Sequence, residues 1–435
     1  MSQSETVGVS LADLDARLMG FHVDEPKAGS VSGVNTIGVT GWILGREVEP
    51  VAVEIVHGHA VIRRVPLQDV RLDVAAAYPH VVGAERSGFR TRIDVPGGTS
   101  EVELALRGVL RDQHRVPLAT IRVRRRWLDR DNCDGAALVS VIIPCYNQAH
   151  FLDEAIESVL AQAYAHFEIV VVDDGSTDNT SQVAARYPGV RCIRQSNQGL
   201  AAARNTGLRE SNGRYLVFLD ADDRLLPNAL EIGVKELNSH PESALAFGRF
   251  HLIDAAGKSL TKQLPRYVGK DHYRELLLNN FIWTTAVVIY RRSVFQFVRG
   301  FDPIADGSED YHLYLRVAQK FPIHYHDQTV SEYRQHGANM NTDSARMLIS
   351  SLMALRSQWR SIKYSPENRR SYKKGIQAWK HAYGDILVKD ILDLMWHRNW
   401  ESAGKKIKVL CLYYPRGFVQ VIRAIGFNIR NRVIG

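Results

Sequence analysis

The chain contains few cysteines and no long apolar run, and each absence narrows the kind of protein it can be. Four cysteines are scattered among its 435 residues without the spacing of metal ligands: Cys133, Cys145, Cys192 and Cys411. We interpret them as reduced, unpaired residues of a cytoplasmic protein. No run of about 18 apolar residues is present, so we expect no membrane-spanning helix. The first residues lack a basic segment followed by an apolar core, so we also expect no secretory signal.

The positive charge of the chain is concentrated at its C-terminus. The formal net charge is +8, and residues 402–435 carry three lysines and four arginines without an acidic residue. A nucleic-acid-binding protein would distribute its basic residues over a surface or along one stripe of it, so we expect no nucleic-acid partner. In this tail, one helical face carries basic residues and the opposite face carries apolar ones: Arg416, Arg423 and Arg430 against Phe418, Ile422, Ile425 and Ile429. Such a helix would either lie on an anionic membrane surface or dock on the protein, and the sequence leaves both open.

The pattern of apolar residues divides the chain into three regions. Residues 1–130 show short alternating stretches punctuated by glycine and proline, which predict a β-sandwich accessory domain. After a charged connector, residues 137–343 alternate between strand and helix patterns, which indicates an α/β domain with parallel strands. Residues 344–435 have a helical pattern. A length of 435 residues is consistent with about three domains.

Three aspartates follow one apolar strand. Residues 215–219 indicate a strand buried on both faces, and three carboxylates come directly after it: Asp220, Asp222 and Asp223. Carboxylates this close repel one another, and Mg²⁺ or Mn²⁺ would relieve the repulsion by binding their oxygens. A solvated acidic loop is the alternative. Asp173 and Asp174 follow another apolar strand, and parallel strands end at one edge of a sheet, so we expect a shared site.

Several ordered motifs extend this acidic segment. The first four are Val139–Asn147, Val172–Thr180, Asn197–Gly207 and Phe218-Leu-Asp-Ala-Asp-Asp223, and two later ones are Glu309–Arg316 and Tyr333–His336. Together they closely resemble the family 2 glycosyltransferases, which are inverting enzymes with the GT-A fold. The resemblance implies a Rossmann-like mixed α/β sheet, a nucleotide-sugar donor that is usually UDP-linked, and a saccharide or lipid-linked acceptor. The N-terminal region loosely resembles β-sandwich modules attached to some bacterial members. Arg299 departs from the pattern of many relatives, which have a glycine there, and this leaves the local loop shape and the acceptor contacts open but not the chemistry.

The resemblance also implies roles for individual residues. Those implied to bind the nucleotide sugar are Pro144, Tyr146, Asp173, Asp174, Arg204, Asp220 and Ala221. Tyr146 would pack against the base, Asp174 would accept a hydrogen bond from the uracil ring, and Arg204 would lie near the diphosphate or ribose. Asp222 would ligate the metal, with His336 as a further ligand. Asp310 matches the catalytic base, and Glu309 beside it, in the acceptor-side motif, would contact the acceptor.

The local pattern places Asp310 at the start of a helix. Ser308 precedes a run with apolar periodicity, so we expect Ser308 to cap the helix and Asp310 to lie in its first turn. The helix dipole favours a carboxylate there, so we expect Asp310 to be ionised and able to accept a proton. An ordinary helix acid is the alternative, as a solvated histidine is for His336. Trp283 is a candidate contact for the donor sugar or acceptor, and packing in the core is its alternative.

These features favour a metal-dependent inverting glycosyltransferase, transferring a hexose or N-acetylhexosamine. We expect it to serve bacterial surface polysaccharide synthesis, in the cytoplasm or peripherally at the inner face of the cytoplasmic membrane. A nucleotidyltransferase of similar fold is an alternative, but no glycine-rich loop with a lysine lies near the first α/β strand. A non-catalytic sugar-binding protein is another, against which the intact Asp222 and Asp310 argue. The sequence does not name the sugar, the acceptor or the linkage.

Overall fold

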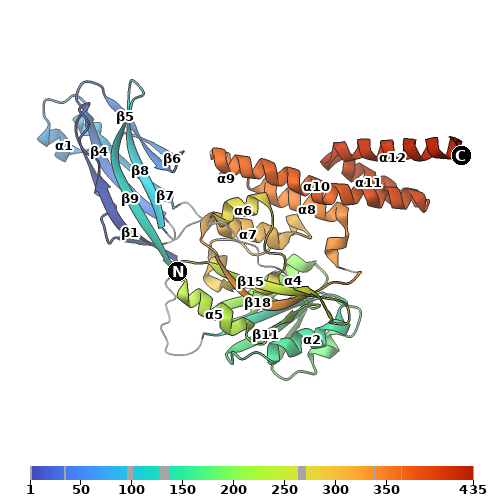
Figure 1. The fold of residues 1–435 in the computed structure, drawn as a ribbon. Coiled ribbons are helices and arrows are strands. Elements are labelled where there is room, and N and C mark those ends of the chain that lie inside the picture. The colour runs from blue at the N-terminus through green and yellow to red at the C-terminus, as the bar shows by residue number, and fades with distance from the viewer. Residues whose placement is uncertain are drawn as a thin grey trace.

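The computed structural model describes the chain in seven stretches: residues 2–33, 36–95, 101–127, 137–262, 271–337, 339–363 and 365–434. Figure 1 shows strands at the N-terminal end, a mixed α/β part in the middle and long helices at the C-terminal end. The site described below lies in the middle part.

The N-terminal strands form two antiparallel sheets. The six-stranded sheet has the order β3-β1-β9-β8-β5-β6, with bounds Val31–Gly33, Ser2–Leu11, Arg115–Trp127, Glu101–Leu110, Pro50–His57 and Ala60–Pro66. The three-stranded sheet has the order β2-β4-β7, with bounds Leu18–Glu25, Thr36–Gly45 and Gly88–Asp94. Alternate residues of β4 and β8 are buried, and apolar side chains of both sheets share one core. This arrangement fits the expected all-β sandwich.

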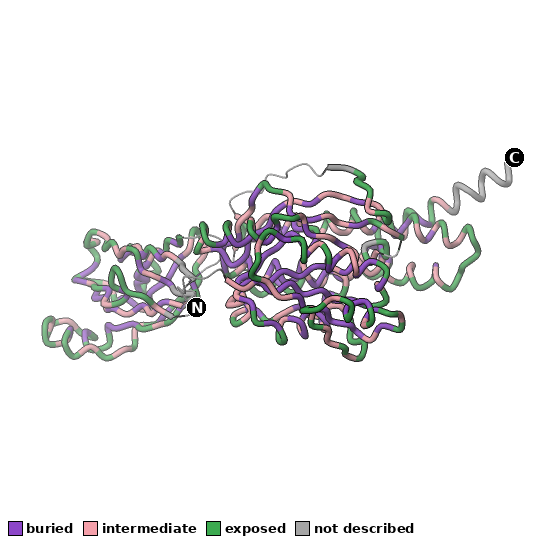
Figure 2. Tube along the Cα trace, turned by 90° about the horizontal axis from the view of Figure 1, so that it is seen from below, coloured by how far each residue is buried: buried purple, intermediate pink, exposed green. Residues whose placement is uncertain are grey.

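The central part is built on one mixed sheet. Its nine strands have the order β12-β11-β10-β13-β17-β15-β18-β14, with β16 paired to β15. In that order their bounds are Val190–Arg194, Phe167–Asp173, Val139–Cys145, Tyr215–Phe218, Val288–Arg291, Leu245–Ile253, His324–Arg334 and Arg224–Leu225, and β16 is Ser259–Lys262. The strands β12, β11, β10 and β13 are parallel, and β17 is antiparallel to β13. All residues of β10 and β13 are buried, as expected for strands covered on both faces. Figure 2 shows buried segments gathered inside the middle part of the molecule.

Helices cover both faces of this sheet. The helices α2 (Ala149–Leu160), α3 (Thr180–Ala184) and α4 (Leu200–Glu210) each follow a parallel strand, and α5 is Ala229–Ser239, α6 is His272–Leu278 and α7 is Glu309–Lys320. The helix α4 lies very close to β10. At Gly207 the two elements leave no room for a side chain, since an added Cβ atom would stand 2.2 Å from Cγ2 of Ile142. The predicted fold class, a mixed α/β sheet after a β-rich region and before a helical one, is confirmed.

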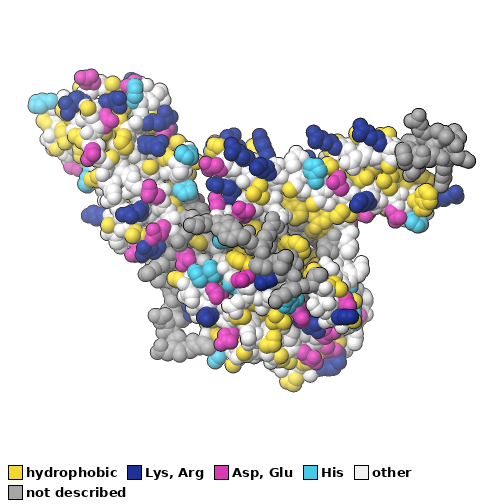
Figure 3. All heavy atoms as spheres, in the orientation of Figure 1, with side chains coloured by type: hydrophobic (Ala, Val, Ile, Leu, Met, Phe, Trp, Pro, Cys, Tyr) yellow, Lys and Arg dark blue, Asp and Glu magenta, His cyan; other side chains and the backbone are white. Residues whose placement is uncertain are grey.

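The C-terminal helices pack against the α/β core and against one another. They are α8 (Ser344–Ser357), α9 (Trp359–Ile362), α10 (Pro366–Trp396), α11 (Trp400–Tyr413) and α12 (Pro415–Ile434). In the tail, Phe418 and Val421 join the apolar cluster of these helices, whereas Ile422 is exposed. The first turns of α12 therefore dock on the protein, while the side chains expected from residue 425 onward lie outside the described residues. Figure 3 shows Lys and Arg side chains along these helices, beside apolar ones.

Among the described residues, no helix combines the length and the apolar character needed to cross a bilayer.

Candidate active site

The aspartates after β13 form a tight turn at the carboxyl edge of the sheet. The amide of Asp223 donates a hydrogen bond to the carbonyl of Asp220 at 3.0 Å, and Ala221 is buried inside the turn. The side chains of Asp220 and Asp222 are 28% and 12% exposed, whereas Asp223 is fully enclosed. Two of the three carboxylates are therefore accessible to a ligand from solvent.

Asp222 is paired with His336. Nε2 of His336 lies 2.9 Å from Oδ2 of Asp222, and Nε2 of Gln148 lies 3.5 Å from the same oxygen. Burial and the neighbouring Asp220 raise the pKa of Asp222, and its hydrogen bond to His336 lowers it. Carboxylate oxygens beside an imidazole nitrogen suit Mn²⁺ or Mg²⁺, and a cation would relieve the repulsion between Asp220 and Asp222. The residues present therefore fit a divalent metal ion.

Arg204 of α4 joins the aspartate turn to the start of α7. Its guanidinium donates to Oδ1 of Asp220 at 2.6 Å and to Oε1 of Glu309 at 2.8 Å, and only 3% of its side chain is exposed. Glu309 also accepts a hydrogen bond from the amide of Gly307 at 2.8 Å. The side chains of Arg204 and Glu309 thus form a buried ion pair. The expected contacts of Arg204 with a diphosphate and of Glu309 with an acceptor would require these buried pairs to break.

The same ion pairs set the environment of Asp310. Its Oδ1 accepts a hydrogen bond from the amide of Tyr311 at 2.6 Å. Burial and the adjacent Glu309 raise its pKa to about 7, against the lowering effect of Arg204. Burial therefore opposes the ionised form of Asp310 that the helix dipole was expected to favour. Ser308 is the N-cap residue, but its hydroxyl bonds to Ser350 at 2.9 Å rather than to the helix.

The negative charges of the aspartate turn and of Asp310 both affect the pKa of one side chain, that of Tyr333. Tyr333 is mostly buried near the end of β18, and burial raises its pKa. The negative charges of the turn and of α7 add to that rise, from Asp223, Asp222, Asp220 and Asp310. Asp310 also contributes to the raised pKa of Arg204. The structure therefore gathers the predicted metal ligands and the predicted base around one centre.

The two aspartates after β11 have different surroundings. Asp173 is fully buried, and its carboxylate accepts hydrogen bonds from Ser176, Ser181 and Arg194. It therefore holds the loop before α3 from inside the protein. Asp174 accepts hydrogen bonds from Gln195 at 2.7 Å and from the amides of residues 198 and 199 at 3.0 and 2.8 Å. A carboxylate has about four acceptor sites, so one remains for a ligand.

Two aromatic residues at the strand ends are open to solvent. Tyr146 follows β10 directly and is 48% exposed, and Trp283 is 51% exposed with its ring 5.8 Å from that of Phe250. About half of the Trp283 surface is therefore open to solvent, and the ring also packs beside Phe250. Pro144 is buried within β10. Both exposed rings can pack against a planar base or a sugar face.

Two residues that hold the site together have no assigned role in the sequence interpretation. Asp223 accepts hydrogen bonds from the amide of Arg334 at 2.9 Å and from the hydroxyl of Thr284 at 3.1 Å. Burial and its neighbours Asp222 and Asp220 raise its pKa well above the usual range. The enclosed guanidinium of Arg334 donates to the carbonyl of Asp222 at 2.8 Å and pairs with Glu154 at 2.6 Å. Two features of the sequence could have indicated these roles: a third aspartate in the acidic cluster, and an arginine two residues before His336.

Comparisons with known proteins agree with this geometry. A profile of "Glycosyl transferase family 2" matches residues 140–299. An uncharacterized glycosyltransferase of Rickettsia felis is 34% identical over 212 residues, covering 46% of this chain and 34% of that protein. This chain thus spans about a third of the length of the first relatives it matches. The uncharacterized glycosyltransferase RP339 of Rickettsia prowazekii is 32% identical over 217 residues, covering 48% of this chain and 68% of that protein.

A named Escherichia coli relative is the UDP-Glc:alpha-D-GlcNAc-diphosphoundecaprenol beta-1,3-glucosyltransferase WfgD. It is 34% identical over 190 residues, covering 41% of this chain and 69% of that protein. Among solved structures, S. aureus TarS in complex with UDP superposes with a TM-score of 0.42 and 20% identity, over 55% of this chain and 70% of that chain. From the profile match, and from relatives covered over two thirds of their length, the chain belongs to glycosyl transferase family 2.

Proposed function

We propose that this protein is a metal-dependent inverting glycosyltransferase that uses a nucleotide-sugar donor. One observation carries the proposal: buried Arg204 bridges Asp220 of the aspartate turn and Glu309 of α7, so the turn and the start of the helix that carries Asp310 are joined through one side chain. A transferase needs a charged site for the leaving diphosphate beside a base for the acceptor hydroxyl. The family to which the chain belongs supports the same chemistry.

Asp222 and His336 are the residues we assign to the divalent cation. When bound, the cation would neutralise the charge that develops on the departing diphosphate. Asp220 is the more exposed carboxylate of the turn, and we assign it to the ribose and to water around the metal. Asp223 and Arg334 position this group, because they fix the turn and the end of β18 from inside the protein.

Asp310 is the residue we assign to general base catalysis. A base is most effective when its pKa lies near the working pH, and burial places the pKa of Asp310 at about 7. In its ionised form it would take the proton of the acceptor hydroxyl as that oxygen attacks the anomeric carbon. Attack from the face opposite the leaving group inverts the configuration at that carbon. The paired Arg204 keeps a positive charge beside Asp310 and so favours the ionised form.

The donor is proposed to be UDP-linked. Tyr146 is exposed at the end of β10, where its ring would pack against the base, and Asp174 retains an acceptor site for a ring N–H. The related WfgD carries UDP-Glc in its name. A thermal-shift screen of UDP-Glc, UDP-GlcNAc and GDP-Man, each with and without Mn²⁺, tests this assignment. We expect the largest stabilisation with a UDP-sugar and Mn²⁺ together, and stabilisation by GDP-Man alone would contradict it.

The acceptor is proposed to be a saccharide or a lipid-linked saccharide in surface polysaccharide synthesis. The exposed ring of Trp283 offers a face for a sugar, and the name of WfgD specifies a diphosphoundecaprenol acceptor. Contact of the basic tail with an anionic membrane would suit such an acceptor. Flotation with anionic vesicles tests this contact. We expect wild type to float and Arg416→Glu/Arg423→Glu to stay in solution, and equal flotation of both would contradict it.

The reaction itself is tested by UDP release from the donor in the presence of Mn²⁺. We expect release by the wild type, its loss with EDTA, and its loss in Asp310→Asn with donor binding retained. Asp306→Asn is the matched control, because Asp306 is exposed nearby and pairs only with Arg346 in the described contacts. Donor binding that is independent of both Mn²⁺ and Asp222→Asn would contradict the proposal and favour a sugar-binding protein.

A further inference from the structure

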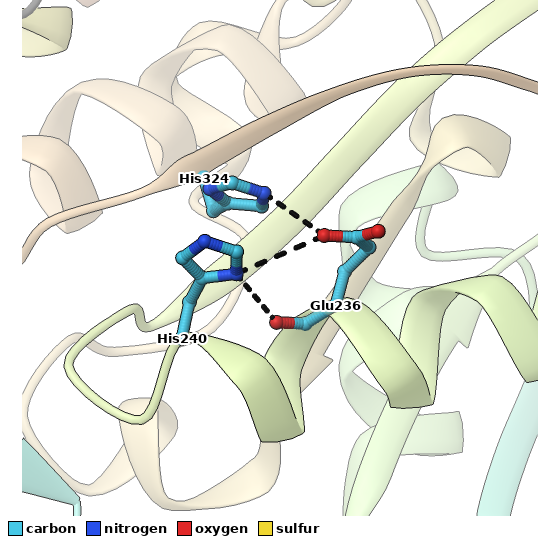
Figure 4. A group of neighbouring side chains, drawn as sticks. All are labelled: Glu236, His240 and His324. Atoms are coloured by element: carbon cyan, nitrogen blue, oxygen red, sulfur yellow. Dashed lines mark hydrogen bonds and ion pairs between the residues drawn. The ribbon is translucent and has the colours of Figure 1, made fainter.

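A second group of metal-binding side chains lies away from the active site. Glu236 and His240 stand one turn apart at the end of α5, and His324 is the first residue of β18 (Figure 4). Each offers one ligand atom, and these atoms lie within 4.8 Å of one another. Oε2 of Glu236 is 3.1 Å from Nε2 of His324 and 3.7 Å from Nδ1 of His240. The two imidazole rings are stacked, with centroids 3.4 Å apart.

These separations are close to those of a metal's ligands. Ligand atoms about 2.0–2.1 Å from Zn²⁺ in a tetrahedral site are about 3.3–3.4 Å apart. The distances from the Glu236 oxygen to the two ring nitrogens, 3.1 and 3.7 Å, bracket that value. The three side chains are partly buried rather than fully solvated, with exposures between 17% and 34%. The three groups are therefore close enough to reach one cation, but the two stacked rings would have to turn out of their parallel arrangement so that a nitrogen of each points at it.

The charges in this group also call for a cation. Within the described part of the chain, the Glu236 carboxylate forms ion pairs with these two imidazoles. Imidazole is uncharged over much of the physiological pH range, and its neutral form is the one that ligates metals. A divalent cation would therefore give this carboxylate a permanent positive partner.

We propose that Glu236, His240 and His324 form a second divalent metal site, with Zn²⁺ as its preferred ion. Two imidazole nitrogens and one carboxylate oxygen are a ligand set typical of zinc, with water in the fourth position. The hydrogen bond between Nδ1 of His240 and the carbonyl of Glu236, at 2.9 Å, would be given up on binding. The site is independent of the proposed transferase reaction.

The position of the site indicates a structural role. Zn²⁺ would join the end of α5 to the first residue of β18, and β18 runs from there to Arg334, two residues before His336. The ten residue steps along β18, at about 3.3 Å each, separate the site from the aspartate turn. A cation at this end would therefore stabilise the strand that leads to the active site without touching the donor.

The test uses this 435-residue chain without a polyhistidine tag, carrying Asp222→Asn and His336→Gln so that the active-site metal is removed. After EDTA treatment and dialysis, ZnCl₂ is added in a calorimeter, and CoCl₂ is added separately to record the visible absorption of a nitrogen-ligated ion. We expect one equivalent of Zn²⁺, a tetrahedral Co²⁺ spectrum and a rise in melting temperature with Zn²⁺. Adding His240→Gln and His324→Gln should abolish all three.

Two further variants make the test decisive. His397→Gln is the matched control, because His397 forms an exposed i,i+4 pair with Asp393 on α10, 3.4 Å apart, and should leave binding unchanged. Glu236→Gln keeps both imidazoles and should weaken Zn²⁺ binding at least about 10-fold, which tests the site even where the double histidine variant fails to fold. Absence of stoichiometric binding, or binding unchanged by Glu236→Gln, would overturn the proposal.

Discussion

Replacing Arg204 by glutamine should move the acid limb of the pH–rate profile to higher pH and destabilise the fold. In the wild type, burial and Glu309 raise the pKa of Asp310 to about 7, and Arg204 opposes this rise. Asp310 acts as a base only when ionised, so kcat/KM should increase with pH through about 7. Without Arg204 the ionised form loses its positive neighbour, the pKa of Asp310 rises further, and activity at pH 7 falls more than activity at pH 9.

The size of the destabilisation follows from the ion pairs. Arg204 contacts Asp220 at 2.6 Å and Glu309 at 2.8 Å, with 3% of its side chain exposed. Removing one partner of a buried pair costs about 3–5 kcal/mol, because the other charge stays buried without compensation. Urea denaturation of Arg204→Gln should show a loss of this order. Arg209→Gln is the matched control, because Arg209 lies on the same helix and donates to Thr206 at 2.8 Å, outside the site.

The double variant Arg204→Gln/Glu309→Gln distinguishes the effect of the removed charges from the effect of the changed side-chain shapes. Removing Glu309 takes away a negative charge that raises the pKa of Asp310, so the acid limb should return toward pH 7. The stability loss should also be smaller than the sum of the two single losses, since the residues share one buried network. The reasoning is refuted if the acid limb of Arg204→Gln stays at the wild-type pH while the protein remains folded.

Three further outcomes are expected. Asp310→Asn should lower kcat about 10²–10⁴-fold, which is the usual contribution of a general base. Calorimetry should show unchanged donor affinity in this variant. An equal loss of kcat in Asp306→Asn would contradict a specific role for Asp310. Asp222→Asn should remove Mn²⁺-dependent donor binding and His336→Gln should weaken it, as measured by titration with UDP and Mn²⁺; unchanged binding in both would exclude these ligands. Burial raises the pKa of Asp223 well above its usual range and so disfavours its charged form. The neutral amide of Asp223→Asn should therefore cost less than about 1 kcal/mol, and Asp223→Ala, which leaves its partners unsatisfied, about 1–3 kcal/mol in urea denaturation.

The sequence alone determined the strands and the edge of the sheet at which polar residues gather. The apolar runs that became β10, β11 and β13 are buried over most of their length, and the aspartates follow them directly. Local pattern suffices there, because a strand buried on both faces must be apolar throughout and parallel strands end at one edge. The helical position of Asp310 followed from the same kind of local reasoning.

Only the tertiary structure decided what each carboxylate does. Asp173 and Asp174 are neighbours in sequence, yet Asp173 holds the loop before α3 and Asp174 holds the segment before α4. Arg204 and Glu309 are 105 positions apart, and their pairing depends on how α4 and α7 pack. The pKa of Asp310 is set by burial and by these partners, which no local pattern encodes. The group of Glu236, His240 and His324 likewise exists because β18 begins beside the end of α5, since desolvation and ion pairing depend on distances in space rather than along the chain.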